Sequence, residues 1–135
     1  MKIHFSDNKK VNRDQLLEIY KANKWSSAEK PDLLVKALLN SDALVTAWHE
    51  DKLIGLGNAI SDGHLVVYYP HLLVHPNYQC KGIGKMIVEK LQEKYAGFHQ
   101  QMLVSDAKAT DFYIKCGFKP AGQAQAMWVY EGDDH

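Results

Sequence analysis

The sequence predicts one domain of mixed α/β (α+β) class, in which a mixed β-sheet is flanked by helices. The 135 residues are enough for one hydrophobic core and too few for two. Apolar residues recur with strand periodicity in some segments and with the i, i+4 spacing of helices in others. The composition, 46% hydrophobic and 24% charged, is that of an ordinary globular protein. We therefore expect residues 1–135 to form a single domain.

The first half of the chain is expected to hold one strand, two helices and a three-stranded meander. Asn12-Arg13-Asp14 supplies capping residues for the first helix, and Pro31 suits the first turn of the second. Asp62-Gly63 is a strong hairpin signal between the last two strands. The expected elements are a strand at 2–5, helices at about 13–23 and 31–40, and strands at 43–48, 53–60 and 65–75.

The second half is expected to alternate helices and strands. Helix 82–95 is followed by strand 101–105, helix 107–115 and a final strand at about 127–130. The expected order along the chain is therefore β-α-α-β-β-β-α-β-α-β.

The stretch Leu72 to Lys85 is the most informative part of the sequence. An apolar strand ends at Pro76-Asn77, and two glycines, Gly82 and Gly84, precede a helix. Backbone N–H groups at a helix start have no partner within the helix, and the helix dipole adds positive charge there. Glycines allow an anion to approach this backbone, so the stretch is suited to holding a phosphate.

Two common nucleotide loops do not fit this spacing. A Walker loop needs glycine at position 79 and serine or threonine at 86, where the chain has Gln79 and Met86. A dinucleotide loop needs glycine or alanine at position 87, where the chain has Ile87. The remaining pattern is Gln79-x-x-Gly82-x-Gly84 after an apolar strand; a glycine-containing turn into a helix, without a ligand, is the alternative.

This pattern resembles the acyl-CoA pyrophosphate loop of the GCN5-related N-acetyltransferases, the GNAT superfamily. Segment 106–120, with Phe112-Tyr113 ahead of Gly117-Phe118, is similar to a second GNAT signature. The resemblance covers about residues 43–130 and implies the GNAT fold. Trp25 before Pro31 looks like the small bacterial and plant arylalkylamine-type group.

The resemblance implies that acetyl-CoA is the cosubstrate and that its contacts lie in three places. The backbone of Leu72, Leu73 and Val74 would hold pantetheine and the thioester carbonyl. Tyr113 would protonate the departing thiolate, unless it is a core aromatic. Asp106, where many relatives have asparagine, would contact pantetheine or cap the following helix. The pyrophosphate would bind the loop made by Gln79, Cys80, Lys81, Gly82, Ile83, Gly84 and Lys85.

The general base is the least defined part of the expected site. The strand before the acetyl site, residues 66–71, has no carboxylate, so His71 is the candidate. A structural histidine and a chain of waters are the alternatives. Tyr69 and His71 are expected on one strand face, with Tyr68 and Pro70 on the other, unless a bulge at Pro70 changes the parity. His71 and His75 lie about 13 Å apart along a strand and cannot share a metal.

The acceptor site is expected to be aromatic. Tyr20, Trp25, Tyr68 and Tyr69 are available near it, and carboxylates are sparse. Such a wall suits an amine with an apolar or aromatic body. The alternative is that Trp25 only packs its loop against the core.

We therefore expect an acetyl-CoA-dependent N-acetyltransferase that acetylates a primary amine of a small molecule by direct attack in a ternary complex. Two alternatives are a protein or peptide N-acetyltransferase and a non-catalytic acyl-CoA-binding module. The formal net charge of zero argues against a nucleic-acid partner. No apolar run is long enough for a membrane span, no signal peptide is recognised, and Cys80 and Cys116 form no CxxC pair. These features favour a cytoplasmic protein without a metal, and they are compatible with a homodimer.

Overall fold

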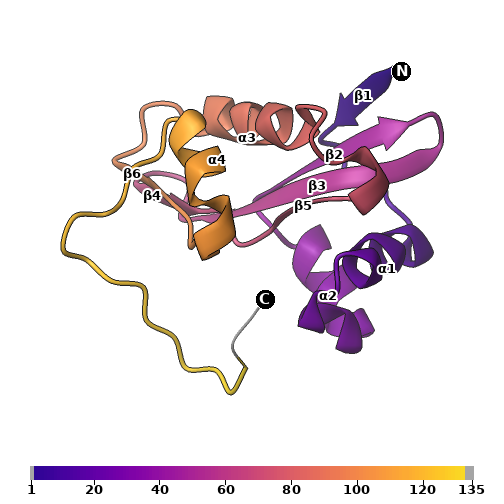
Figure 1. The fold of residues 1–135 in the computed structure, drawn as a ribbon, viewed down its shortest axis with the longest axis horizontal. Coiled ribbons are helices and arrows are strands. Elements are labelled where there is room, and N and C mark those ends of the chain that lie inside the picture. Colours follow the sequence, from indigo (N-terminus) through magenta and orange to yellow (C-terminus); the bar gives the residue numbers. More distant parts are fainter. Residues whose placement is uncertain (1, 133–135) are drawn as a thin grey trace.

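The computed structural model describes residues 2–132. The chain forms a mixed sheet with helices on both faces (Figure 1), which confirms the expected fold class. Its helices are α1 (Arg13–Ala22), α2 (Pro31–Leu39), α3 (Ile83–Lys94) and α4 (Thr110–Lys115), with short 3-10 turns η1 (Ser26–Glu29), η2 (Pro76–Tyr78) and η3 (Ala107–Ala109). Its strands are β1 (Ile3–Ser6), β2 (Ala43–His49), β3 (Lys52–Ser61), β4 (Val66–Tyr68), β5 (Leu72–Val74) and β6 (Gln100–Met102).

The sheet has the strand order β1-β2-β3-β4-β6, with β5 paired to β3 beside β4. All pairs are antiparallel except β4–β6, which is parallel. A parallel pair needs a long crossover, and α3 provides it between β5 and β6.

One apolar cluster fills each face of the sheet. On one face α3 buries Ile83, Ile87 and Leu91, which share one helix side, against the sheet. On the other face α1 and α2 bury a second cluster that includes Leu16, Tyr20 and other apolar residues. The two clusters explain why both helical layers stay on the sheet, with α3 above and α1 and α2 below in Figure 1.

The expected third strand, 65–75, is interrupted by a β-bulge. Ile60 pairs with Tyr68 and Gly57 with Leu72, so two residues of β3 face three residues, 69–71. Pro70 cannot donate a ladder hydrogen bond and suits this place. Asn58 links the two strands across the bulge. Its backbone N–H donates to the carbonyl of His71, and its side-chain Oδ1 accepts from the N–H of His71. The strand therefore continues with its side-chain parity reversed.

The expected final strand at 127–130 is wrong for this structure. The chain after α4 forms no strand up to residue 132 and runs away from the sheet as an extended trace, yellow in Figure 1. Within residues 2–132, β6 therefore has β4 as its only strand partner. A strand requires hydrogen bonds to a neighbouring strand as well as β-forming residues, and residues 127–130 pair with no strand within residues 2–132.

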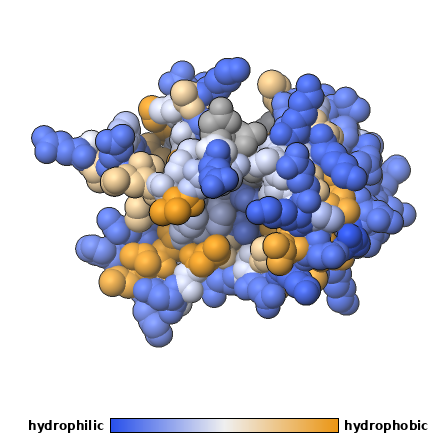
Figure 2. Space-filling model, turned by 90° about the horizontal axis from the view of Figure 1, so that it is seen from below, coloured by the Kyte–Doolittle hydropathy of each residue, from blue (hydrophilic) through white to orange (hydrophobic). Residues whose placement is uncertain are grey.

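Other apolar residues on the surface are scattered. In the space-filling view from below, hydrophobic residues form separate orange patches among hydrophilic ones (Figure 2). No helix within residues 2–132 has the length and apolar character needed to cross a membrane.

Candidate active site

A groove of about 630 Å³ lies where β5, the loop after it, the start of α3 and α4 meet. Most of the residues expected to bind the cofactor lie along it, although they come from distant parts of the chain. It is lined by Asn23, Trp25, Leu72, Leu73, Val74, Tyr78, Gln79, Cys80, Gly82, Ile83, Gly84, Lys85, Lys108, Ala109, Phe112 and Tyr113.

One wall of the groove is the free edge of β5. The N–H of His75 donates to Ile54 and the N–H of Asn58 donates to His71, so residues 71, 73 and 75 face β3. Leu72 and Val74 consequently turn their backbone groups the other way, toward the groove. The neighbouring strand β6 pairs with β4 rather than with β5. The sheet is therefore splayed at this point, and the backbone of β5 can pair with an extended ligand.

The loop after β5 presents backbone N–H groups at the start of α3. Cys80 and Gly82 both adopt left-handed conformations, with φ of 62° and 82°, and α3 follows directly at Ile83. Successive N–H groups in such a turn form an anion-binding concavity, to which the helix dipole adds. The ammonium groups of Lys85 and Lys108, both on residues lining the groove, add positive charge.

Gly84 is needed for a different reason. A Cβ built at this position would lie 3.4 Å from the Phe112 ring of α4. The small residue thus lets α4 approach the start of α3, which closes the groove on that side.

A side-chain clamp joins this loop to β5 and α1. Gln79 Nε2 donates to Asn23 Oδ1 at 3.1 Å and to the Val74 carbonyl at 2.9 Å. Asn23 Nδ2 donates to the same carbonyl at 3.1 Å and to the Ile19 carbonyl at 3.0 Å. Gln79 therefore holds the loop in place with its side chain. Asn23 was not identified from the sequence, where it is one polar residue in a loop after a helix.

Tyr113 projects from α4 and lines the groove, and it also contacts the core. Its ring lies 6.0 Å from that of Phe118, centroid to centroid. Burial, with smaller contributions from the charges of Cys116 and Asp106, raises the pKa of Tyr113 to about 12. The phenol is therefore protonated at neutral pH and can donate a hydrogen bond into the groove.

Three aromatic residues from separate elements, among them two of those expected at the acceptor site, form a cluster. The ring of His71 lies 5.0 Å from Trp25 and 5.5 Å from Tyr20, between centroids. His71 Nδ1 and Tyr20 Oη share a hydrogen bond of 2.7 Å. Tyr20 is fully buried, which raises the pKa of its phenol well above the usual range. Trp25 is the member of this cluster that lines the groove, while also packing on the α1 and α2 core.

The other two expected acceptor residues are not part of that cluster. The bulge places Tyr69 on the α3 face, where it is buried, stacks edge-on with Tyr95 and Phe118, and donates to Gln101 Oε1 at 2.7 Å. The structure therefore shows the stated exception, in which a bulge at Pro70 changes the parity and Tyr69 and His71 lie on opposite faces. Tyr68 is exposed on the same face as His71 and does not line the groove.

Two expected cofactor residues lie outside the groove lining. Lys81 is exposed on the loop. Asp106 precedes η3 and makes no side-chain capping hydrogen bond, so the expected capping role is not seen. Its charge still acts on the site, since it contributes to the raised pKa of Tyr113.

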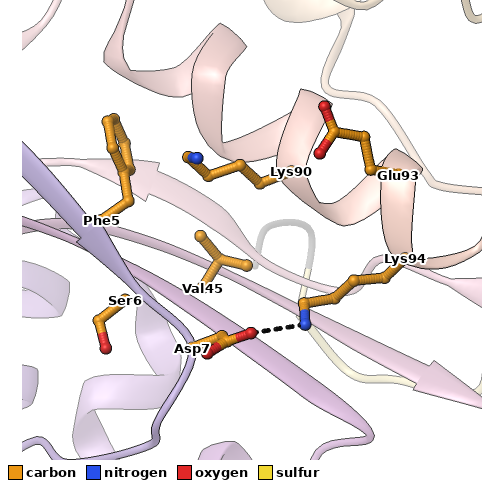
Figure 3. A pocket seen from close by; sticks show the side chains of 7 residues that line it. All are labelled: Phe5, Ser6, Asp7, Val45, Lys90, Glu93 and Lys94. Atoms are coloured by element: carbon orange, nitrogen blue, oxygen red, sulfur yellow. Dashed lines mark hydrogen bonds and ion pairs between the residues drawn. The ribbon is translucent and has the colours of Figure 1, made fainter.

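A second hollow lies at the C-terminal end of α3, and its charged side chains contact other residues of the chain. Lys94 Nζ contacts Asp7 Oδ2 at 2.7 Å, and Lys90 Nζ lies 5.2 Å from the centroid of the Phe5 ring (Figure 3). These contacts hold α3 against β1 and the residue after it. The charged side chains of this hollow are of both signs and do not point to one ligand. In residues 2–132 there is no group of three or more His, Cys, Asp or Glu side chains able to hold a metal ion.

The chain is similar to known acetyltransferases in sequence and in overall fold. The chain is 28% identical to an uncharacterized N-acetyltransferase from Pyropia yezoensis, over 93% of this chain and 76% of the relative. It is 36% identical to the chloroplastic GCN5-related N-acetyltransferase 2 of Arabidopsis thaliana, over 58% of this chain and 32% of that protein. A GNAT family acetyltransferase structure from Streptococcus pneumoniae superposes with a TM-score of 0.84 at 24% identity, covering 97% of this chain and all of the other.

One structural neighbour is in complex with a CoA-containing ligand. The enzyme AAC(6')-Iy, in complex with the bisubstrate analogue CoA-S-monomethyl-acetylneamine, has a TM-score of 0.73 and 13% identity, over 98% of this chain and all of that one. At this identity the likeness concerns the fold. The family model described as an acetyltransferase (GNAT) domain matches residues 40–120, more than half of the sequence. The chain therefore belongs to the GNAT family of acetyltransferases.

Proposed function

We propose that this protein transfers the acetyl group of acetyl-CoA to a primary amine of a small molecule, by direct attack in a ternary complex. One observation carries the proposal. The free edge of β5, the anion-binding turn at the start of α3 and the protonated phenol of Tyr113 all line the same groove. An extended thioester with a pyrophosphate at one end requires these three features in this order.

The loop and the strand edge would position acetyl-CoA. The pyrophosphate would accept hydrogen bonds from backbone N–H groups of residues 80–85, beside Lys85 and Lys108. The pantetheine arm would pair with the outward backbone of Leu72 and with the N–H of Val74, whose carbonyl already accepts from Gln79 and Asn23; this pairing would direct the thioester toward Tyr113. Asp106 would act at a distance, by keeping the Tyr113 phenol protonated.

Acetyl transfer then needs two proton movements. The neutral amine attacks the thioester carbonyl, the C–N bond forms and the C–S bond breaks. Tyr113 gives its proton to the departing thiolate, and the amine gives one up to a base. A tyrosine phenol has an ordinary pKa near 10, and burial raises that of Tyr113 further, so Tyr113 holds its proton throughout the physiological pH range.

His71 is the proposed base, and its hydrogen bond to Tyr20 decides whether it can act. If Nδ1–H donates to Tyr20 Oη, Nε2 keeps its lone pair and can accept a proton. If the Tyr20 hydroxyl donates instead, Nε2 carries the hydrogen and water must remove the amine proton. His71→Gln should abolish the acidic limb of the pH–rate profile in the first case and leave it unchanged in the second.

The acceptor is proposed to carry an aromatic or extended apolar body. Trp25 lines the groove, and the described lining residues include two lysines and no carboxylate. A polyamine would bring several ammonium groups to a site that offers them no anionic partner. This agrees with the arylalkylamine-type subgroup, which stays a prediction.

A panel of amines assayed with acetyl-CoA tests the proposal. Thiol release should be fastest with arylalkylamines, slower with spermidine, and slowest with a lysine-containing peptide. Faster acetylation of the peptide would favour the protein-acetyltransferase alternative. Calorimetric binding of acetyl-CoA without turnover of any amine would identify an acyl-CoA-binding module. We place the enzyme in the cytoplasm, where the free thiols of Cys80 and Cys116 would remain reduced.

A further inference from the structure

Two histidines contact η2, the short turn that leads from β5 into the anion-binding turn. His75 is the N-cap residue of η2, and His49, at the end of β2, contacts Tyr78, the last residue of η2. Neither histidine lines the cofactor groove, whereas Tyr78 does. The two histidines can therefore affect a bound cofactor through the position of η2.

His75 supplies the hydrogen bond that the backbone of η2 lacks. Pro76 has no N–H, and the N–H of Tyr78 donates to the His75 carbonyl at 2.8 Å. The N–H of Asn77 remains, and it donates to His75 Nδ1 at 3.1 Å. Nδ1 can accept a hydrogen bond only while the imidazole is neutral and carries its hydrogen on Nε2. The cap therefore exists in one protonation state of His75.

The hydrogen bond of His49 does not have this requirement. Its Nδ1 lies 2.8 Å from Tyr78 Oη, and a phenol oxygen can either donate or accept. A neutral His49 can accept from the hydroxyl, and a protonated His49 can donate to it. Protonation of both histidines therefore opens the contact at the start of η2 and keeps the contact at its end.

The ring of His75 is only partly buried, so it can exchange protons with water. It lies beside the ring of Tyr78, with 6.1 Å between centroids. Charged or titratable side chains lie around it from α1 and, behind Tyr78, from β2 and β3: Asp14, Glu18, Lys21, His49 and Lys52. Among residues 2–132, only the N–H of Asn77 forms a hydrogen bond or ion pair with the His75 ring.

We propose that His75 is a positioning residue for the cofactor, and that acetyl-CoA binds the form of the protein in which this histidine is neutral. The inference rests on the proposed function. When Nδ1 takes up a proton, it and the N–H of Asn77 become two donors that face each other, so the cap opens. The loop after η2 then adopts conformations that do not present its N–H groups together. The apparent affinity falls with the fraction of chains that keep the binding conformation.

The direction of the pH dependence follows from this preference. Histidine side chains change their charge between about pH 5 and 8. Because the neutral form binds, the affinity for acetyl-CoA should be complete above this range and should fall as the pH drops through it. The proposed base His71 affects the rate of transfer, so binding measured without an amine separates the two histidines.

Calorimetric titration with acetyl-CoA at about pH 5.5 and about pH 8, without an amine, tests the proposal. The phosphates of acetyl-CoA also titrate, near about pH 6, but they contribute equally in every variant. His75→Asn keeps a capping acceptor that does not titrate. It should bind like wild type at the higher pH and about fivefold more tightly than wild type at the lower pH, the factor expected for one lost N-cap.

Two further variants complete the comparison. His75→Ala has no cap at either pH, so it should bind about fivefold more weakly than wild type at about pH 8. His99→Asn makes the same change at an exposed histidine away from the groove and should follow wild type. Equal losses of affinity at low pH in wild type and His75→Asn would overturn the proposal. A His75→Ala variant that binds as tightly as wild type at about pH 8 would also overturn it.

The amide signal of Asn77 tests the cap in the ligand-free protein. In nuclear magnetic resonance spectra of the wild type, its chemical shift should change with pH together with the ring signals of His75. This step should disappear in His75→Asn. If acetyl-CoA binds and the Asn77 signal does not follow His75, the inference fails while the proposed function stands. If the wild type binds no acetyl-CoA at any pH, the proposed function fails, and the Asn77 signal alone decides whether His75 holds η2.

Discussion

The two sides of the active-site groove are built in different ways. The cofactor side uses backbone groups from one continuous stretch, Leu72 to Lys85, whose conformation is set by glycines and by the clamp of Gln79 on Val74. The proposed acceptor side consists of a cluster of side chains from three separate segments, Tyr20, Trp25 and His71, of which Trp25 lines the groove. A side made of backbone tolerates many side chains but few conformations. A side made of side chains can change its ligand with one substitution.

This difference predicts which measured quantity each substitution changes. Changes on the cofactor side should affect acetyl-CoA affinity or the chemical step for every amine. Changes on the acceptor side should affect one class of amine and leave acetyl-CoA binding near its original value.

Tyr113→Phe is expected to have the largest effect. Removing the phenol proton should lower kcat about 10²–10⁴-fold, with little change in the dissociation constant of acetyl-CoA. Tyr95→Phe is the matched control, because Tyr95 donates to Asp42 away from the groove. Unchanged single-turnover rates in Tyr113→Phe would return this residue to a purely structural role.

Gly82→Val should weaken acetyl-CoA binding at least about tenfold, because a β-branched residue disfavours the left-handed φ of 82° and the turn would lose its shape. Gly63 provides a close control. It has a φ of 83° and, like Gly82, no atom within 4 Å of a built Cβ. Gly63→Val should lower the melting temperature similarly without changing the dissociation constant measured by calorimetry. Equal losses of affinity in both variants would point to general destabilisation.

Trp25→Ala should raise the Michaelis constant for an aryl amine several-fold, consistent with a cation–π contribution of about 0.5–2 kcal/mol, and leave that for acetyl-CoA near its original value. Trp48→Ala removes a tryptophan that packs on the same core, stacked on His4 and away from the groove. Both variants should melt at lower temperature, but only Trp25→Ala should discriminate between amines. If both Michaelis constants rise together, Trp25 serves packing alone.

The smallest expected effect is a difference in alkaline titration between Tyr113 on the cofactor side and Tyr20 on the proposed acceptor side. Burial raises the pKa of Tyr113 to about 12, and that of Tyr20 further. Since an unfolded tyrosine titrates near 10, both favour the folded state below pH 10, and this stabilisation is lost as pH rises toward 12. Phenolate absorbance should therefore show Tyr113 ionising before Tyr20, whose signal should appear only with unfolding. Burial also raises the pKa of Tyr69 and Tyr95 above the usual range, so Tyr20→Phe should remove only part of the later signal. Ionisation of Tyr20 in the folded protein would contradict its burial.

The sequence alone was sufficient for the fold class, and it pointed to the stretch from Leu72 to Lys85, most of which lines the groove. The residues of that stretch are close along the chain, and their function depends on local conformation. Glycine at a left-handed position and proline at a strand end restrict the backbone wherever the segment lies. The order of the elements up to α4 was visible for the same reason, since periodicity is a local property.

Tertiary structure alone decided the acceptor side and the end of the chain. One extra residue at Pro70 sends Tyr69 into the core and turns His71 toward Tyr20. The proline marked a possible bulge in the sequence, but only the assembled sheet shows that the bulge forms. Asn23 reaches Gln79 across 56 residues of sequence. Met127 to Tyr130 have the side chains of a strand, but pairing needs an edge, and an edge is a property of the assembled sheet rather than of the segment.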